Sequence, residues 1–155
     1  MTEFHEILKI ADIHAARIKM ALNKLNPSLP FDASKITSLT EKELLLTDLL
    51  VYRFGKLQDL LGNKIINEFL KIIDEYADNL TMLDKVNKLE RLEIIKNVEL
   101  WKEMRKIRNH VANEYPEHPE LTAEYLNTII RLSPNLLQIL DNIKTFNADY
   151  QSRDR

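Results

Sequence analysis

The stretch Ser38–Gly62, SLTEKELLLTDLLVYRFGKLQDLLG, combines a helix-start signal with a run of leucines at helical spacing. It opens with two overlapping capping boxes, in which a hydroxyl and a carboxylate three residues apart can satisfy the first free N–H groups of a helix. The two boxes pair Ser38 with Glu41 and Thr40 with Glu43. The stretch therefore predicts a long amphipathic helix, and the glycine at its end predicts a stop.

The same helical period recurs on both sides of this stretch. Apolar residues at this spacing predict further helices over residues 4–25, 65–76, 82–95, 98–115 and 120–146. Asn97 is placed to cap the helix that begins at residue 98, and Pro116 is placed to end it. Pro134 lies inside the last helix, where it should cause a kink or a brief break.

Length and composition agree with a helical bundle. The chain has 155 residues, enough for one domain with a real core, and its 2 glycines and 5 prolines favour long helices over tight hairpins. No segment shows the alternation of a strand. We therefore predict an all-α fold, a single antiparallel bundle of five to six helices over residues 1–150, with a polar tail at 151–155.

Several function classes are excluded by what the sequence lacks. It has no cysteine, so it offers no thiol nucleophile and no disulfide framework. Two glycines cannot build a Walker loop or a dinucleotide fingerprint, and no HExxH pattern occurs. No signal peptide or apolar run of membrane-spanning length is found. We expect a cytoplasmic protein that needs no metal, no cofactor and no membrane.

Polar chemistry is concentrated in the stretch Trp101–Pro119, WKEMRKIRNHVANEYPEHP. Residues 85–108 carry eight basic side chains against four acidic ones, whereas residues 109–130 carry four glutamates and no lysine or arginine. A basic segment of this kind can attract phosphates, although a mixed charged helix face is more often only solvated. Of the remaining histidines, His14 is expected to be structural, and His5 and His118 to be exposed.

The segment IRNHVANEYP, residues 107–116, resembles the signature of HEPN domains (higher eukaryotes and prokaryotes nucleotide-binding), an arginine followed by a histidine after four to six residues. It is most similar to the toxin branch, whose signature is Arg-Asn-x-x-x-His-x-Tyr. Arg108, Asn109 and Tyr115 match this signature in place. The upstream segments YRFGKLQDLLG, LDKVNKLERLEII and VELWKEMRKIRN resemble the same branch, so the resemblance covers roughly residues 45–145.

This resemblance implies a helical bundle that forms a homodimer, in which the two motifs face one another across a shared cleft. It also implies metal-independent endoribonuclease activity, with RNA as the substrate. Toxins of this branch are paired with a minimal nucleotidyltransferase antitoxin, which in some pairs adenylylates the motif tyrosine. That tyrosine corresponds to Tyr115. An equally open interpretation is that Tyr115 only packs its ring at the helix end.

The family histidine falls on Asn113. When RNA is cleaved by its own 2′-hydroxyl, one group must take the hydroxyl proton and another must protonate the leaving oxygen, and imidazole titrates in the right range for both. An amide cannot do so, and losing this help typically costs about 10²–10⁴-fold in rate. Arg108 can still bind a phosphate and stabilise developing negative charge. We expect impaired catalysis at a site that still binds phosphate.

A shifted pair offers a second interpretation of the site. Arg105 and His110 repeat the arginine-to-histidine spacing one turn earlier, and His110 lies three residues before Asn113, on nearly the same helix face. His110 is therefore a candidate catalytic residue, while Arg105 and Asn109 are candidates for binding RNA phosphates. The alternative is that this spacing is accidental and both Arg105 and His110 are ordinary surface residues.

Three hypotheses follow. The chain is a HEPN-type toxin with ribonuclease activity that is weakened or uses His110. Alternatively, it is a catalytically inactive HEPN protein that binds nucleotide, RNA or a nucleotidyltransferase partner. The third possibility is a helical interaction module in which the polar stretch is merely a dimer surface.

Overall fold

The computed structural model describes residues 3–110 and 117–153, and within these ranges the chain is helical apart from short links, with no strand. The elements are α1 (Glu3–Leu25), the 3₁₀ turn η1 (Asn26–Ser28), α2 (Ala33–Thr37), α3 (Glu41–Leu60), the π turn η2 (Leu61–Ile65), α4 (Ile66–Ile72), α5 (Met82–Arg91), α6 (Val98–His110) and α7 (Pro119–Arg153). The predicted all-α bundle is confirmed.

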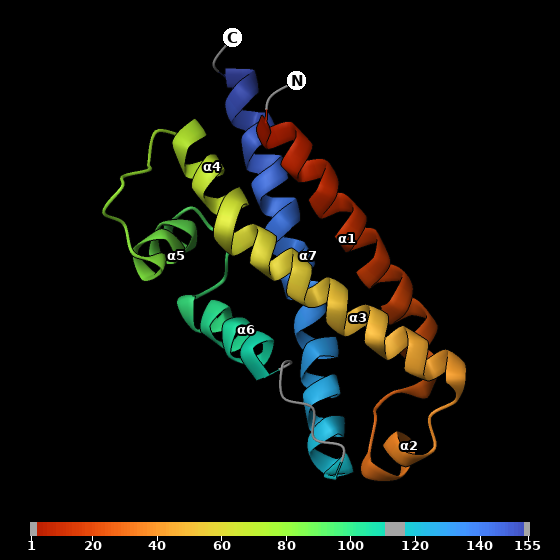
Figure 1. The fold of residues 1–155 in the computed structure, drawn as a ribbon. Coiled ribbons are helices and arrows are strands. Elements are labelled where there is room, and N and C mark those ends of the chain that lie inside the picture. Colours follow the sequence, from red (N-terminus) through yellow and green to blue (C-terminus); the bar gives the residue numbers. More distant parts are fainter. Residues whose placement is uncertain (1–2, 111–116, 154–155) are drawn as a thin grey trace.

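Three long helices form the body of the molecule. α1, α3 and α7 lie side by side, while α5 and α6 lie on the other side of α3 from α1 (Figure 1). Ile18, Phe54 and Ile129 are fully buried members of the core, one from each long helix. Burying one such side chain stabilises the fold by about 1.5–3 kcal/mol, so this shared core dominates the stability.

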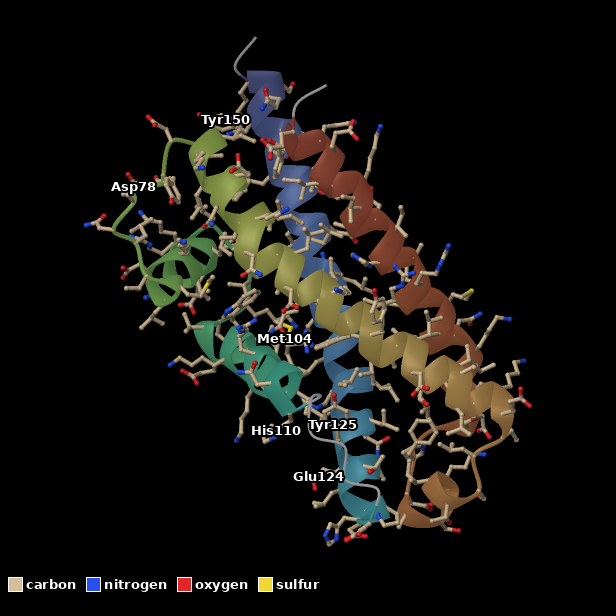
Figure 2. The ribbon with its side chains drawn as sticks, in the orientation of Figure 1. Asp78, Met104, His110, Glu124, Tyr125 and Tyr150 are labelled. Carbon is tan, nitrogen blue, oxygen red and sulfur yellow. The ribbon has the colours of Figure 1, made fainter. Side chains whose placement is uncertain are left out.

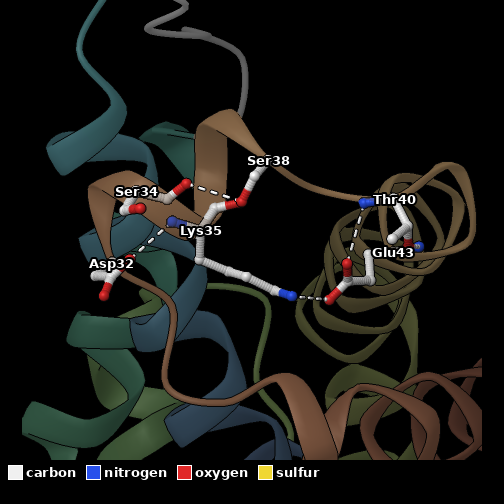
Figure 3. Close-up of polar contacts among 6 residues, drawn as sticks. All are labelled: Asp32, Ser34, Lys35, Ser38, Thr40 and Glu43. Carbon is white, nitrogen blue, oxygen red and sulfur yellow. Dashed lines mark hydrogen bonds and ion pairs between the residues drawn. The ribbon is translucent and has the colours of Figure 1, made fainter.

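Two features fix the link between α1 and α3. Asn127 on α7 binds both backbone groups of Phe31: its Oδ1 accepts from the Phe31 N–H at 3.0 Å, and its Nδ2 donates to the Phe31 carbonyl at 2.8 Å. The second feature is the short helix α2, which lies within this link and which the sequence pattern did not predict. Asp32 caps it by accepting from the Lys35 N–H at 2.7 Å (Figure 3).

One of the two predicted capping boxes forms. The Thr40 hydroxyl accepts from the Glu43 N–H at 3.1 Å, and the Glu43 carboxylate accepts from the Thr40 N–H at 3.0 Å (Figure 3). The Ser38 box does not form, because Ser38 ends α2 and its hydroxyl donates to the carbonyl of Ser34 at 3.0 Å. α3 therefore begins at Glu41, directly after Thr40.

The stop predicted at Gly62 is wrong. The helix passes through η2 into α4 without a break, so the two predicted helices are one rod over residues 41–72. Gly62 is buried in helical geometry, and a Cβ at this position would lie 3.4 Å from Cζ2 of Trp101. Packing against α6 explains this glycine. The rod ends at Asp74, whose φ of 62° lets the Glu75 N–H donate to the Leu70 carbonyl at 2.8 Å.

The outcomes for the other predicted helix boundaries are mixed. Asn97 caps α6 as predicted, since its Oδ1 accepts from the Leu100 N–H at 2.8 Å. α5 ends at Arg91, four residues earlier than predicted, and Glu93 then turns the chain with a φ of 61°. Pro134 does not interrupt α7, which continues to Arg153. Pro116 lies outside the described residues.

None of the described helices combines the length and apolarity that crossing a membrane requires.

Glu43 should make the stability of the fold depend on pH. Its buried carboxylate pairs with Lys35 Nζ at 2.8 Å, and this contact, with hydrogen bonds from Ser28 and Thr40, lowers the pKa of Glu43 from 4.5 to about 2. Because the folded-state pKa lies below the unfolded value, the stabilisation is present above about pH 4.5 and is lost as the pH falls towards 2. We expect Glu43→Gln to lower the thermal midpoint at pH 7, and the difference from the wild type to shrink across this window.

Glu41→Gln is the matched control, because Glu41 is exposed in the same first turn of α3. It should show a much smaller change at pH 7. Thermal unfolding followed by circular dichroism at several pH values measures both variants. A Glu43→Gln variant as stable as the wild type at pH 7 would contradict the assignment.

Candidate functional site

The candidate site lies where the last turn of α6 meets the outward face of α3. Trp101 and Met104 anchor α6, since both are buried. Arg108 follows Met104 by four residues and Trp101 by seven, so it continues the buried stripe of α6 towards solvent. The side chain of Arg108 is therefore held at the edge of the core.

Asp59 of α3 binds Arg108 through two contacts. Arg108 Nε donates to Asp59 Oδ1 at 3.3 Å, and Arg108 Nη2 donates to Asp59 Oδ2 at 2.9 Å. This forked pairing fixes the plane of the guanidinium. Within the described part of the chain, the remaining nitrogen, Nη1, makes no hydrogen bond.

A second arginine shares the same carboxylate. Nη1 of Arg105 lies 3.6 Å from Oδ1 of Asp59, a looser contact than that of Arg108. Two guanidinium groups thus stand against one carboxylate, which leaves an excess of one positive charge. Asp59 raises the pKa of Arg108 further above its ordinary value by accepting its hydrogen bonds, so Arg108 stays charged at every physiological pH.

Gly55 makes the approach of Arg108 possible. A Cβ built on Gly55 would lie 2.9 Å from Arg108 Nε and 3.1 Å from its Cζ, closer than side-chain atoms normally come. Gly62, seven residues later, faces Trp101, and a Cβ there would lie 3.4 Å from the indole, at ordinary van der Waals distance. Trp101 and Arg108 are also seven residues apart. The two glycines of the chain therefore mark the line along which α6 lies on the α3 rod.

Tyr125 adds a hydroxyl from α7. Its hydroxyl oxygen is buried and has no hydrogen-bond partner among the described residues. Burial raises the pKa of Tyr125 strongly, and the charge of Arg108 opposes this shift only in part. Tyr125 is therefore a neutral phenol close enough to Arg108 to feel its charge. Figure 2 shows Tyr125 on α7 beside the end of α6 that carries His110.

The predicted site residues separate into two groups. The structure brings Arg105 and Arg108 together on Asp59. It places Asn109 and His110 at the exposed end of α6, and within the described part of the chain neither of them contacts Asp59. The predicted catalytic position Asn113 and the predicted adenylylation site Tyr115 both lie outside the described residues.

His14 has a structural environment. It is half-buried on α1, and its Nδ1 lies 3.0 Å from Arg53 Nη1 on α3. Because an arginine can only donate, this Nδ1 carries no proton. Burial lowers the pKa of His14, and the charges of Arg53 and Lys56 lower it further. His14 therefore links α1 to α3 as a neutral ring, and the site gains no imidazole from it.

Two cavities lie among the described residues, away from the two arginines of the candidate site. A cavity of about 530 Å³ lies between α2 and α7 and is lined by Phe31 and Asn127 among others. A second, of about 580 Å³, is lined by residues near Ile94 and Pro134. Neither includes Arg105, Arg108 or Asp59. Among residues 3–110 and 117–153, no cluster of histidines and carboxylates is placed to hold a metal ion. The site is an open surface, which suits an extended ligand.

Sequence reasoning missed Gly55, Asp59 and Tyr125. Gly55 and Asp59 are one turn apart in YRFGKLQDLLG. A glycine followed four residues later by an acid on one helix face leaves room for an arginine and supplies its ion-pair partner. That signal was present but did not say which helix would supply the arginine. Tyr125 carried no signal, because its position matches the apolar face of α7.

A double-mutant cycle should detect the Arg108–Asp59 contact. Both side chains are partly exposed, so we expect a coupling of about 0.5–1 kcal/mol between Arg108→Ala and Asp59→Ala, weaker in 1 M salt. In a Gly55→Ala background the added methyl displaces the guanidinium, and the coupling should fall towards zero. Urea unfolding measures these differences. A coupling of zero in the unmodified background would contradict the pairing.

No family model and no curated protein matches the chain. Its function must therefore be inferred from the residues of the site, from their chemistry and from the resemblance of its motif.

Proposed function

We propose that this chain is a HEPN-type toxin that binds RNA through Arg108 and Arg105 and cleaves it without a metal, at a rate limited by Asn113. One observation carries the proposal: Asp59 and Gly55 hold Arg108 at the surface with Nη1 left unbonded in the described part of the chain. A guanidinium fixed in this way suits a phosphate, which it can contact without rearranging.

The chemistry assigned to the arginines is electrostatic. In the cleavage step the 2′-oxygen attacks phosphorus, the bond to the 5′-oxygen breaks, and negative charge grows on the phosphate oxygens. Arg108 and Arg105 stabilise that charge. The 2′-hydroxyl must lose its proton and the leaving oxygen must gain one, and Asn113 can do neither. Reaction therefore falls back on water or on His110 and is slow.

A catalytically inactive protein that binds RNA, nucleotide or a nucleotidyltransferase partner is the second candidate. One observation favours it: within the described residues, the cluster around Asp59 contains two guanidinium groups and a phenol, but no imidazole. Such a cluster can bind a phosphate but has no group that titrates near neutrality. His110 is the nearest described imidazole along α6, and it is exposed.

The resemblance of the motif also supports a homodimer in which two copies of the site face one another. It further supports a minimal nucleotidyltransferase antitoxin as the partner, with Tyr115 as the residue it would adenylylate. In a homodimer, the excess positive charge at each Asp59 would be doubled along one cleft. A polyanion such as RNA would then bind more strongly than a single phosphate.

Restoring the family histidine should test the proposal most directly. We expect Asn113→His to raise the rate of cleavage of single-stranded RNA by about 10²–10⁴-fold, because it supplies the missing general acid–base group. A chelator should leave this activity unchanged. Arg108→Ala in the same background should abolish the gain. A time course with labelled RNA on denaturing gels provides the measurement.

His110→Ala in the natural background separates the two sources of activity. Loss of the residual cleavage would assign it to His110. Equal and robust cleavage by the natural chain and by Asn113→His would contradict the role given to Asn113. No cleavage by either, with binding that depends on Arg108, would favour the inactive protein.

A further inference from the structure

We propose that Tyr52 is a stacking platform for an unpaired RNA base beside the Arg108 phosphate site, which makes single-stranded RNA the ligand. This inference rests on the proposed function and extends it to a residue outside the motif. Its starting point is an aromatic ring that the fold does not use. Tyr52 lies on α3 and is 55% exposed, although most aromatic side chains of the chain pack against the core.

Two cations lie against the ring of Tyr52. Cζ of Arg53 is 5.4 Å from the ring centroid, and Nζ of Lys56 is 5.5 Å from it. Both distances fall within the range of a cation–π contact. An exposed aromatic ring flanked by basic side chains is the arrangement by which proteins bind single strands, since the ring stacks a base while the cations meet the phosphates.

The ring lies in line with the candidate site. Tyr52, Gly55 and Asp59 are spaced at i, i+3 and i+7, so they share one face of α3. Arg108 crosses this face at Gly55 and ends on Asp59. Tyr52 is one turn before the crossing, and seven residues place it about 10.5 Å from Asp59 along the axis. A short segment of RNA can therefore reach the platform and the arginines together.

The charges along this face favour a polyanion. On the outward face of α3 and the adjoining turn of α6, three cations, Lys56, Arg105 and Arg108, stand against the two carboxylates of Asp48 and Asp59. Arg53 is half-buried and pairs with His14. An apolar protein surface covering Tyr52 would bury the exposed Lys56 without a matching acid, which is costly. RNA phosphates neutralise these cations and leave them hydrated.

The platform selects for unpaired bases. In an A-form duplex each base is already stacked between its neighbours, and the ring of Tyr52 cannot reach its face. A single strand exposes its bases, and stacking on an aromatic ring tolerates any sequence because every base has a π-face. The ligand is therefore a single strand or a loop, recognised with little sequence preference at this position.

The test measures binding of the full chain to two short fluorescent strands of equal length and charge, one carrying bases and one abasic. Both strands are 2′-O-methylated, so that they bind without being cleaved. We expect Tyr52→Ala to weaken binding of the base-bearing strand by about fivefold or more, the size of one lost stacking contact. It should leave binding of the abasic strand unchanged. Tyr52→Phe and Tyr52→Trp should bind both strands like the wild type.

Two controls separate stacking from other effects. Leu45→Ala removes an equally exposed apolar side chain seven residues earlier on the same face and should change neither affinity. Arg108→Ala should weaken binding of both strands, because the phosphate site does not need a base. Circular dichroism confirms that each variant is folded.

Each of the other experimental outcomes would overturn either the stacking platform or the proposed function. If Tyr52→Ala leaves both affinities unchanged, or lowers both equally, the platform is overturned, while binding that still needs Arg108 preserves the proposed function. If Tyr52→Ala and Leu45→Ala instead weaken self-association in sedimentation without affecting RNA, this face is a protein interface and the platform is overturned. If the wild type binds neither strand, the proposed function itself fails, and the platform with it.

Discussion

The close approach of α6 to the α3 rod is the constraint on which the site depends. The two glycines of the chain, Gly55 and Gly62, are seven residues apart on α3 and η2, and they face Arg108 and Trp101, which are seven residues apart on α6. At one end Gly62 lies against the indole of Trp101, which is buried in the core. At the other the missing Cβ of Gly55 admits a guanidinium to Asp59. The same packing therefore buries the base of α6 and presents its arginine.

This arrangement explains where sequence reasoning succeeded and where it failed. Capping depends on neighbours three residues apart, so the Thr40 box and the Asn97 cap could be predicted from the sequence. Gly62 could not be, because a glycine that ends a helix and one that accepts a neighbouring helix look alike until the neighbour is known. The Ser38 box failed for a similar reason: the linker forms its own helix, which uses the serine hydroxyl.

Sequence reasoning identified Arg108 but missed Asp59 and the exposed ring of Tyr52. The motif pointed to Arg108, because arginine, asparagine and tyrosine recur there at a recognisable spacing. Asp59, its partner, is 49 residues away along the chain, and nothing local to either residue connects them. Tyr52 fits the helical period of the leucines in Ser38–Gly62, so the pattern alone does not separate it from a core position. Its exposure follows from the crossing of α6 and α1 over α3, which a one-dimensional pattern does not contain.

Asp59 would have two opposing effects on a phosphate, the ligand that we propose. It repels the phosphate, yet without it the two guanidinium groups would repel one another and lose their fixed orientation. The contact distances indicate how this conflict is resolved. Arg108 is bound through two nitrogens at 3.3 and 2.9 Å, whereas Arg105 makes one contact at 3.6 Å. For the proposed ligand, the looser arginine could turn from the carboxylate to a phosphate at little cost, while the tighter one could use Nη1, which makes no hydrogen bond among the described residues. Asp59 thus positions Arg108 firmly and binds Arg105 only loosely.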